Sequence, residues 1–196
     1  METRTPRRRV GRAEREQQIL DAAVVVFSER GFQNASMDAV AERVGVTKPV
    51  LYTHFGSKDG LLLACIARAR SELLEVTTAA AAAAPNPEEM LRQGTLAFFA
   101  YLERQKPAWT MLYNESAVAG DALEGIRAQQ TDFIAALLAA QAPDADRQRL
   151  EGWSQVIVGA CERLAIWRAT EGSVSAEQAT GYLMDLVWTG LGTIRA

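Results

Sequence analysis

The 196-residue sequence contains one histidine and two cysteines, too few for most catalytic and metal-binding clusters. It lacks a metal-spaced set of His, Cys and acidic residues, a glycine-rich phosphate loop and a nucleophile elbow. A small helical enzyme is therefore the weaker functional alternative, and no catalytic residue, cofactor or metal ligand is assigned. Cys65 and Cys161 lie far apart within helical patterns, which indicates buried, reduced thiols; a redox role stays open.

Long apolar runs are also missing. The apolar patch from Thr95 to Leu102 falls short of the ~18 residues that a membrane span requires. The arginines near the N-terminus are followed by polar residues 12–18, where an export signal would be apolar. We therefore expect a soluble, cytoplasmic protein with no membrane partner.

Charge differs between the two parts of the chain, although the formal net charge is only -3. Residues 1–60 hold ten basic and eight acidic residues, whereas residues 61–196 hold eleven and sixteen. The arginines near the start are Arg4, Arg7, Arg8, Arg9 and Arg12. This composition is typical of a basic arm that follows a phosphate backbone, and a solvated, disordered tail is the alternative. We expect the two parts of the chain to bind different partners.

Helical periodicity dominates, and no alternating strand pattern bounded by turns is present. The predicted fold class is all-α, with nine helices whose boundaries follow from capping residues, glycines and prolines. They begin near residues 12, 36, 47, 57, 88, 108, 120, 144 and 175; the seventh extends at least to Leu138, and the others end near 30, 45, 55, 84, 105, 118, 170 and 193. The alanine tract from Ala79 to Ala84 is compatible with a linker, but its helix propensity favours a helical end.

The first three predicted helices have the proportions of a helix-turn-helix, with Val44-Gly45-Val46 as the turn. Glycine allows positive φ there, so the third helix can leave the second at a steep angle. Leu51 and Phe55, four residues apart, are predicted to pack inward. The side chains then available to DNA are those of Lys48, Pro49, Val50, Tyr52, Thr53 and His54.

An ordered set of residues extends beyond this pattern. It consists of Ile19-Leu20-Asp21-Ala22-Ala23, Phe27, Gly31-Phe32, Ala35-Ser36-Met37, Ala41, Gly45-Val46, Leu51-Tyr52, His54-Phe55, Ser57-Lys58 and Leu61-Leu62. Over about residues 12–62 the set resembles the N-terminal signature of the TetR family of transcriptional regulators. The rest of the chain is similar to the family only in length and helix count. The resemblance implies a basic arm (1–11), a DNA-binding domain (12–60) and an effector-binding and dimerisation domain (61–196).

The resemblance also implies roles in DNA binding. Ser36 and Thr47 would bind phosphates at helix starts, and Lys48 would read guanine. Pro49 and Val50 would touch thymine methyl groups. Tyr52, His54 and Lys58 match phosphate-contacting positions, with Thr53 exposed beside them. Each of the last three residues has an alternative interpretation. Tyr52 could pack in the core, His54 could have a structural role, and Lys58 could be a solvated cap residue.

The last two predicted helices are apolar over so wide an arc that each needs two neighbours. We expect them to form a four-helix interface in a homodimer, with a monomer that buries its C-terminal hairpin as the alternative. Two copies are also needed because one short reading helix carries too few base contacts to select a genomic site. The expected interface residues are Trp153, Ile157, Leu164, Trp167, Leu183, Leu186, Val187, Gly190 and Leu191.

The resemblance further implies that the fourth to eighth helices enclose a pocket for a small, lipophilic effector. The expected pocket residues are Phe98, Leu102, Trp109, Tyr113, Asn114, Gln130, Phe133 and Trp153. Aromatic side chains of this kind also serve as plain core, and a lipophile-binding protein with a vestigial N-terminal motif is a further alternative. The expected function is a repressor that binds a pseudo-palindromic operator and is released by its effector, with activation left open.

Overall fold

The computed structural model describes residues 11–106 and 116–192, and every regular element in these ranges is an α-helix. The helices are α1 (Arg12–Asn34), α2 (Met37–Val44), α3 (Lys48–Phe55), α4 (Lys58–Ala82), α5 (Pro87–Arg104), α7 (Ser116–Gln141), α8 (Arg147–Glu171) and α9 (Ala176–Gly192). The all-α fold class is confirmed, with eight helices in the described ranges where nine were predicted for the chain. Most of the predicted sixth helix lies outside these ranges, and residues 116–118 belong to α7.

Side-chain caps begin the helices where the sequence places Ser, Asn or Asp. The side chains of Ser36, Ser57 and Asn86 accept hydrogen bonds from backbone N–H groups of the first turns of α2, α4 and α5. The predicted start and end of α2 and the helical alanine tract are confirmed, although α4 ends at Ala82. Gly31 has a φ of 71° and a ψ of 154°, which are not helical, so the helix that begins at Arg12 is interrupted there as predicted; a short further helical stretch, which was not predicted, extends α1 to Asn34.

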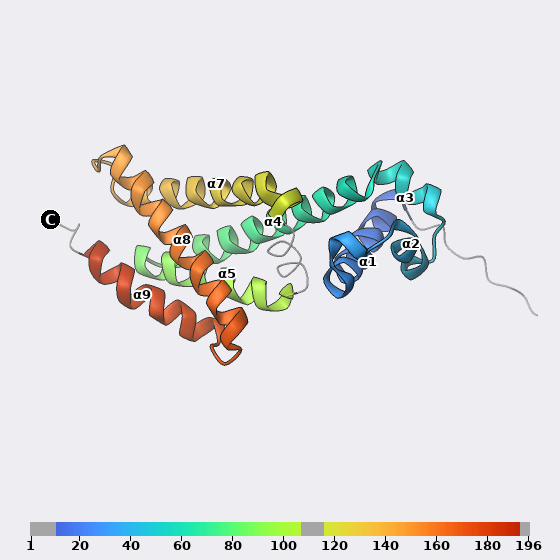
Figure 1. The fold of residues 1–196 in the computed structure, drawn as a ribbon. Coiled ribbons are helices and arrows are strands. Elements are labelled where there is room, and N and C mark those ends of the chain that lie inside the picture. The colour runs from blue at the N-terminus through green and yellow to red at the C-terminus, as the bar shows by residue number, and fades with distance from the viewer. Residues whose placement is uncertain (1–10, 107–115, 193–196) are drawn as a thin grey trace, which may run out of the picture.

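The helices form two regions that share α4 (Figure 1). α1, α2, α3 and the start of α4 enclose one core, centred on fully buried side chains such as Phe27, Leu51 and Leu62. α4 continues out of this region and packs against α5 and α7. α8 packs against α7, and α9 packs against α5 and α8. Because α4 spans both regions, their buried apolar side chains form one continuous cluster that extends from α1 to α9.

Among the described helices, none has an apolar stretch of the length that would be needed to pass through a bilayer.

Candidate DNA-reading surface and ligand cavity

The turn between α2 and α3 depends on Gly45. Its φ of 75° and ψ of 38° lie in the left-handed region, and its N–H donates to the carbonyl of Ala41 at 2.9 Å. A residue with a side chain is strained in this conformation. The chain therefore leaves α2 sharply and enters α3 two residues later.

α3 has one buried side and one open side. Leu51 is fully buried, which confirms its predicted inward direction, and Phe55 is half-buried. Thr47, Lys48, Pro49, Tyr52 and Thr53 are exposed, and Tyr52 retains 45% of its accessible surface. Val50 is half-buried between the two sides. The open side thus carries five of the predicted DNA-binding residues on one short helix and its cap.

Lys48 is paired with a residue of α2. Its Nζ donates a hydrogen bond to Asp38 at 2.8 Å, and this bond and the negative charge of Asp38 raise the pKa of Lys48. Ser36 is exposed and its Oγ accepts from the Ala39 N–H at 3.2 Å. Ser36 and the Lys48–Asp38 pair lie on the same side of α2 and α3, near the starts of these helices.

His54 and Lys58 are less open than the other candidates. The His54 side chain is 12% exposed, and its Nδ1 lies 4.0 Å from a carboxylate oxygen of Glu16 in α1. Lys58 Nζ donates to the backbone carbonyls of Phe32, Gln33 and Ala35 and lies 4.4 Å from the centre of the Phe32 ring. Lys58 thus caps the C-terminal end of α1. Because the three donor hydrogens of its ammonium already have acceptors, a phosphate could bind only by sharing or replacing one of the three carbonyl oxygens.

The predicted interface residues fall into two groups. Ile157 and Leu183 are buried inside the subunit, and Trp153, Leu164 and Val187 are half-buried. Trp167 and Leu186 are exposed. Gly190 lies in α9, but its exposure and that of Leu191 fall outside what is described.

The outer faces of α8 and α9 are apolar beyond the predicted set. Val156 is 63% exposed and Leu186 76%, and Trp167 and Tyr182, whose ring centres are 6.3 Å apart, are also exposed. Gly152 and Gly159 lie on the exposed face of α8 that carries Val156. A partner helix can approach closely beside these glycines, because a Cβ added at either position has no atom within 4 Å.

A cavity of about 290 Å³ lies between α4, α5, α7, α8 and α9. Four of the predicted effector-binding residues line it: Phe98, Gln130, Phe133 and Trp153. Leu102 does not line it, because its side chain is buried in the core that continues toward α1. Trp109, Tyr113 and Asn114 lie outside the described residues.

Sequence reasoning missed several cavity residues. The missed apolar residues on α5 are Met90 and Leu91, and those on α7 are Leu123, Ile126, Ile134, Leu137 and Leu138. The missed charged residues are Arg127 of α7 and Glu162 of α8, which form two hydrogen bonds with each other. These bonds raise the pKa of Arg127. The apolar residues recur at helical spacing on α7, a signal that could have found them; the charged pair had no comparable signal.

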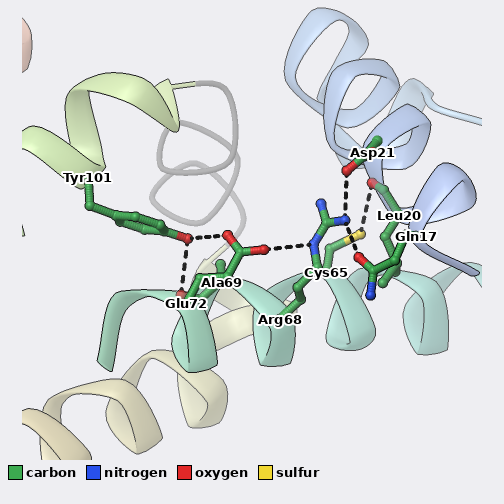
Figure 2. A network of polar contacts seen from close by, with 8 residues as sticks. All are labelled: Gln17, Leu20, Asp21, Cys65, Arg68, Ala69, Glu72 and Tyr101. Atoms are coloured by element: carbon green, nitrogen blue, oxygen red, sulfur yellow. Dashed lines mark hydrogen bonds and ion pairs between the residues drawn. The ribbon is translucent and has the colours of Figure 1, made fainter. Parts of the chain in front are cut away.

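Polar contacts connect α1, α4 and α5 between the two regions (Figure 2). Arg68 of α4 donates to Asp21 of α1 at 2.7 Å and lies 3.6 Å from Glu72, one turn further along α4. The Tyr101 hydroxyl of α5 donates to Glu72 and to the Ala69 carbonyl, each at 3.1 Å. Burial, followed by the charge of Glu72, raises the pKa of Tyr101, so the hydroxyl keeps its proton. A shift of α5 relative to α4 therefore changes contacts that lead to α1.

Both thiols are buried, as predicted. Cys65 contacts the Leu20 carbonyl between α4 and α1, whereas Cys161 lines the cavity. Burial raises the pKa of each thiol to about 12. Among the residues that the structure describes, no three His, Cys, Asp or Glu side chains are grouped so that they could hold a metal ion.

Two protein families match parts of this chain. The family described as bacterial regulatory proteins, tetR family, matches residues 19–65, and the tetracyclin repressor-like C-terminal domain matches residues 87–190. The transcriptional activator FasR of Mycolicibacterium smegmatis is 29% identical over 95% of this chain and 87% of its own length. The transcriptional repressor BepR of Brucella suis is 32% identical over 63% of this chain and 62% of its own length.

Solved structures agree with these matches. A TetR-like transcriptional regulator from Rhodococcus sp. RHA1 has a TM-score of 0.74 and 35% identity, covering 96% of this chain and 99% of its own. A regulator from Pseudomonas aeruginosa PAO1 has a TM-score of 0.81 at 17% identity, covering 94% and 93%, and shows the shared fold alone.

Proposed function

Since the chain belongs to the TetR family of bacterial regulatory proteins and is a DNA-binding transcriptional regulator, we propose that it acts in the cytoplasm as a homodimeric repressor. The dimer binds a pseudo-palindromic operator, and a small, lipophilic effector releases it. The chain is a regulator and not an enzyme.

The open side of α3 is the observation that carries the proposal. Leu51 is buried and anchors the helix, while Thr47, Lys48, Pro49, Tyr52 and Thr53 are exposed to solvent. A short helix exposed in this way fits the major groove, where Lys48 can reach guanine O6 and N7. Until then Asp38 holds the Lys48 ammonium, and guanine or phosphate replaces that carboxylate on binding.

We expect the residues around the open side of α3 to contact DNA phosphates. Ser36 and Thr47 are exposed at the starts of α2 and α3, where backbone N–H groups point outward. Tyr52 reaches a phosphate from the open side, and Val50 contributes apolar contact together with Pro49. His54 and Lys58 act at the edge of the surface: His54 faces Glu16, and Lys58 exchanges one of its carbonyl acceptors for a phosphate.

The test of DNA binding is selection of bound genomic fragments by the purified protein, followed by titration of the selected site at several salt concentrations. Lys48→Ala weakens binding to that site by ~1–3 kcal/mol if Lys48 reads a base, or lowers the salt slope by about 1 if it binds phosphate. Arg147→Ala, on the far region, is the matched control, because Arg147 is highly exposed and pairs only with Glu151 in the described chain. No selected site, or equal behaviour of the two variants, contradicts the proposal.

The homodimer uses the outer faces of α8 and α9. Val156, Trp167, Tyr182 and Leu186 form an exposed apolar face of the kind that a second copy covers in a two-fold four-helix interface. Leu186→Arg is expected to give monomers in sedimentation velocity experiments, because an interface core does not accept an unpaired charge. Leu63→Arg, at an exposed leucine of α4, is the control and stays dimeric. Wild-type protein that sediments as a monomer rules this interface out.

The effector occupies the cavity between α4, α5, α7, α8 and α9, and Phe98, Gln130, Phe133 and Trp153 contact it. Its binding favours one arrangement of α4, α5 and α7 over another, and the contacts of Tyr101, Glu72 and Arg68 carry the difference to α1. The two reading helices of the dimer then no longer match successive grooves.

Activation is the second candidate, because a relative that matches almost the whole chain is named an activator. A reporter gene behind the selected operator distinguishes the two functions. Repression predicts that deletion of the regulator raises expression, whereas activation predicts that deletion lowers it.

A further inference from the structure

Gln130 is a buried amide with no hydrogen-bond partner among the described residues. It is 8% exposed and lines the cavity. An amide has two donor hydrogens and an acceptor oxygen, and leaving them unsatisfied in an apolar environment is unfavourable. The amide of Gln130 is therefore available to a ligand, and it favours one that brings a hydrogen-bonding group.

The charged residues of the cavity wall are already neutralised. Arg127 Nε donates to Glu162 at 2.8 Å, its Nη2 also donates to Glu162, and its Nη1 donates to Glu124 at 3.3 Å. All three nitrogens of the guanidinium are thus engaged by two carboxylates. Among the described residues that line the cavity, Arg127 and Glu162 are the charged ones. Residues 107–115, whose placement is not described, contain Glu115 and no Lys or Arg.

The remainder of the cavity is long and apolar. Its lining extends along α7 from Leu123 to Gln141, a distance of about 27 Å at 1.5 Å per residue. Arg127, Gln130 and Glu162 lie toward one part of this length. Leu137, Leu138, Met90, Leu91, Leu150 and Trp153 surround the other part, together with the exposed Gln141, whose amide donates to Met90 Sδ at 4.0 Å. A ligand that fits this arrangement has one polar end and a long apolar end.

We propose that the effector is an uncharged, elongated amphiphile whose single hydroxyl or carbonyl group hydrogen-bonds the amide of Gln130. This inference rests on the proposed role of the cavity as the effector site and deepens it by naming the ligand class. A free carboxylate is excluded from the class. It would meet the negative charge of Glu162, and the guanidinium of Arg127 beside it already pairs with the carboxylates of Glu162 and Glu124, so the ligand would have to compete with both.

Three ten-carbon probes test the ligand class: 1-decanol, methyl decanoate and sodium decanoate. Binding to the full-length protein is followed by tryptophan fluorescence without DNA, because Trp153 and Trp188 line the cavity. Decanol and methyl decanoate are expected to bind at least about tenfold more tightly than decanoate, which corresponds to 1.4 kcal/mol. Decanoate binding as tight as decanol binding overturns the inference, and so does a failure of all three probes to bind.

Two variants separate this site from simple partition of an apolar tail. Glu162→Gln frees Arg127, so decanoate affinity should rise at least about tenfold while decanol affinity changes less than about threefold. Gln130→Leu removes the amide at similar size, so decanol affinity should fall about five- to tenfold, as expected for one lost hydrogen bond. Unchanged decanoate binding to the first variant overturns the charge argument, and unchanged decanol binding to the second overturns the role of Gln130.

The inference and the proposed function fail in different ways. If decanol binds as expected but the protein selects no DNA, the ligand class holds and the regulatory function is wrong. If the protein selects an operator but the three probes rank otherwise, the function stands and the ligand class is wrong.

Discussion

The core around α1, α2 and α3 and the space between α4, α5, α7 and α8 differ in how completely they are filled. The first encloses fully buried side chains such as Ile19, Phe27 and Leu51, and its helix starts and turn are capped. The second contains a cavity of about 290 Å³, and the Gln130 amide and the buried Thr131 hydroxyl in it have no hydrogen-bond partner in the part of the chain that the structure describes. Close packing fixes the geometry that a DNA groove requires, whereas incomplete packing leaves room for a ligand.

The largest test of this difference replaces one phenylalanine in each region. Phe27→Ala should lower the free energy of unfolding by about 3–5 kcal/mol, because it opens a void in a filled core. Phe133→Ala should cost about half as much, since Phe133 is half-buried and already faces the cavity. Urea denaturation of both variants measures the two values. Equal losses would mean that the two regions are packed alike.

Glycine substitutions compare the backbone of the two regions. Gly45→Ala should cost about 1–2 kcal/mol, since alanine is strained at φ 75° although no atom lies within 4 Å of the added Cβ. Gly120→Ala in α7 has equally open surroundings but a helical backbone, so it should gain about 0.5–1 kcal/mol. Thermal denaturation gives both signs. A neutral Gly45→Ala would show that the turn does not need this conformation.

The two cysteines provide a pH test, one in each region. An unfolded thiol loses its proton near pH 9.0, whereas Cys65 and Cys161 keep theirs to about pH 12 when folded. Stability contributed by each neutral thiol is therefore present below pH 9 and is lost as the pH rises toward 12. At pH 10 the loss is about 1.4 kcal/mol for each thiol.

Alanine variants isolate this contribution. Between about pH 8 and pH 10, Cys65→Ala and Cys161→Ala should each lose less stability than wild-type protein. The difference should equal the contribution of the one thiol that was removed. Urea denaturation at the two pH values measures it. If Cys161→Ala loses as much stability between the two pH values as wild-type protein while Cys65→Ala loses less, then water in the cavity hydrates the Cys161 thiolate. The two regions would then also differ in how well they hydrate a charged thiolate.

Thr131 gives the smallest expected effect. Its buried Oγ1 has no hydrogen-bond partner among the described residues, so Thr131→Val should raise the free energy of unfolding by about 1 kcal/mol. Thr77→Val, on α4, is the control and should lower stability, because the Thr77 hydroxyl donates to the Leu73 carbonyl at 2.8 Å. Differential scanning calorimetry resolves the two directions. Destabilisation by Thr131→Val would mean that its hydroxyl is bonded in solution.

Local signals in the sequence predicted most of the fold. Ser36, Gly45 and Ser57 act through neighbours a few residues away, so the boundaries of α2 and the start of α4 could be read directly. The short helical stretch after Gly31 was not predicted; in it, Phe32 packs its ring against that of Phe27, with the ring centres 5.5 Å apart. That contact depends on packing rather than on propensity.

The sites were less predictable because they depend on how each helix is rotated. Periodicity groups Ile157 with Trp167 and Leu183 with Leu186, but it does not show that the first of each pair is buried within the subunit and the second exposed. Leu102 was predicted to line the cavity and has helical spacing to Phe98, but its side chain is buried in the core. Arg127 and Glu162, 35 positions apart, look like ordinary surface charges until α7 and α8 are placed together.

α4 has a mechanical consequence that follows from its length. It is one uninterrupted helix of 25 residues, about 37 Å long, with Lys58 holding the end of α1 at one end and Thr77 and Ala81 lining the cavity at the other. A tilt of ~5° about one end displaces the opposite end by ~3 Å, which is about the rise of one base pair. If the cavity binds an effector as proposed, a helix of this length converts a small displacement at the ligand into a shift of the DNA-binding region comparable to one base-pair step.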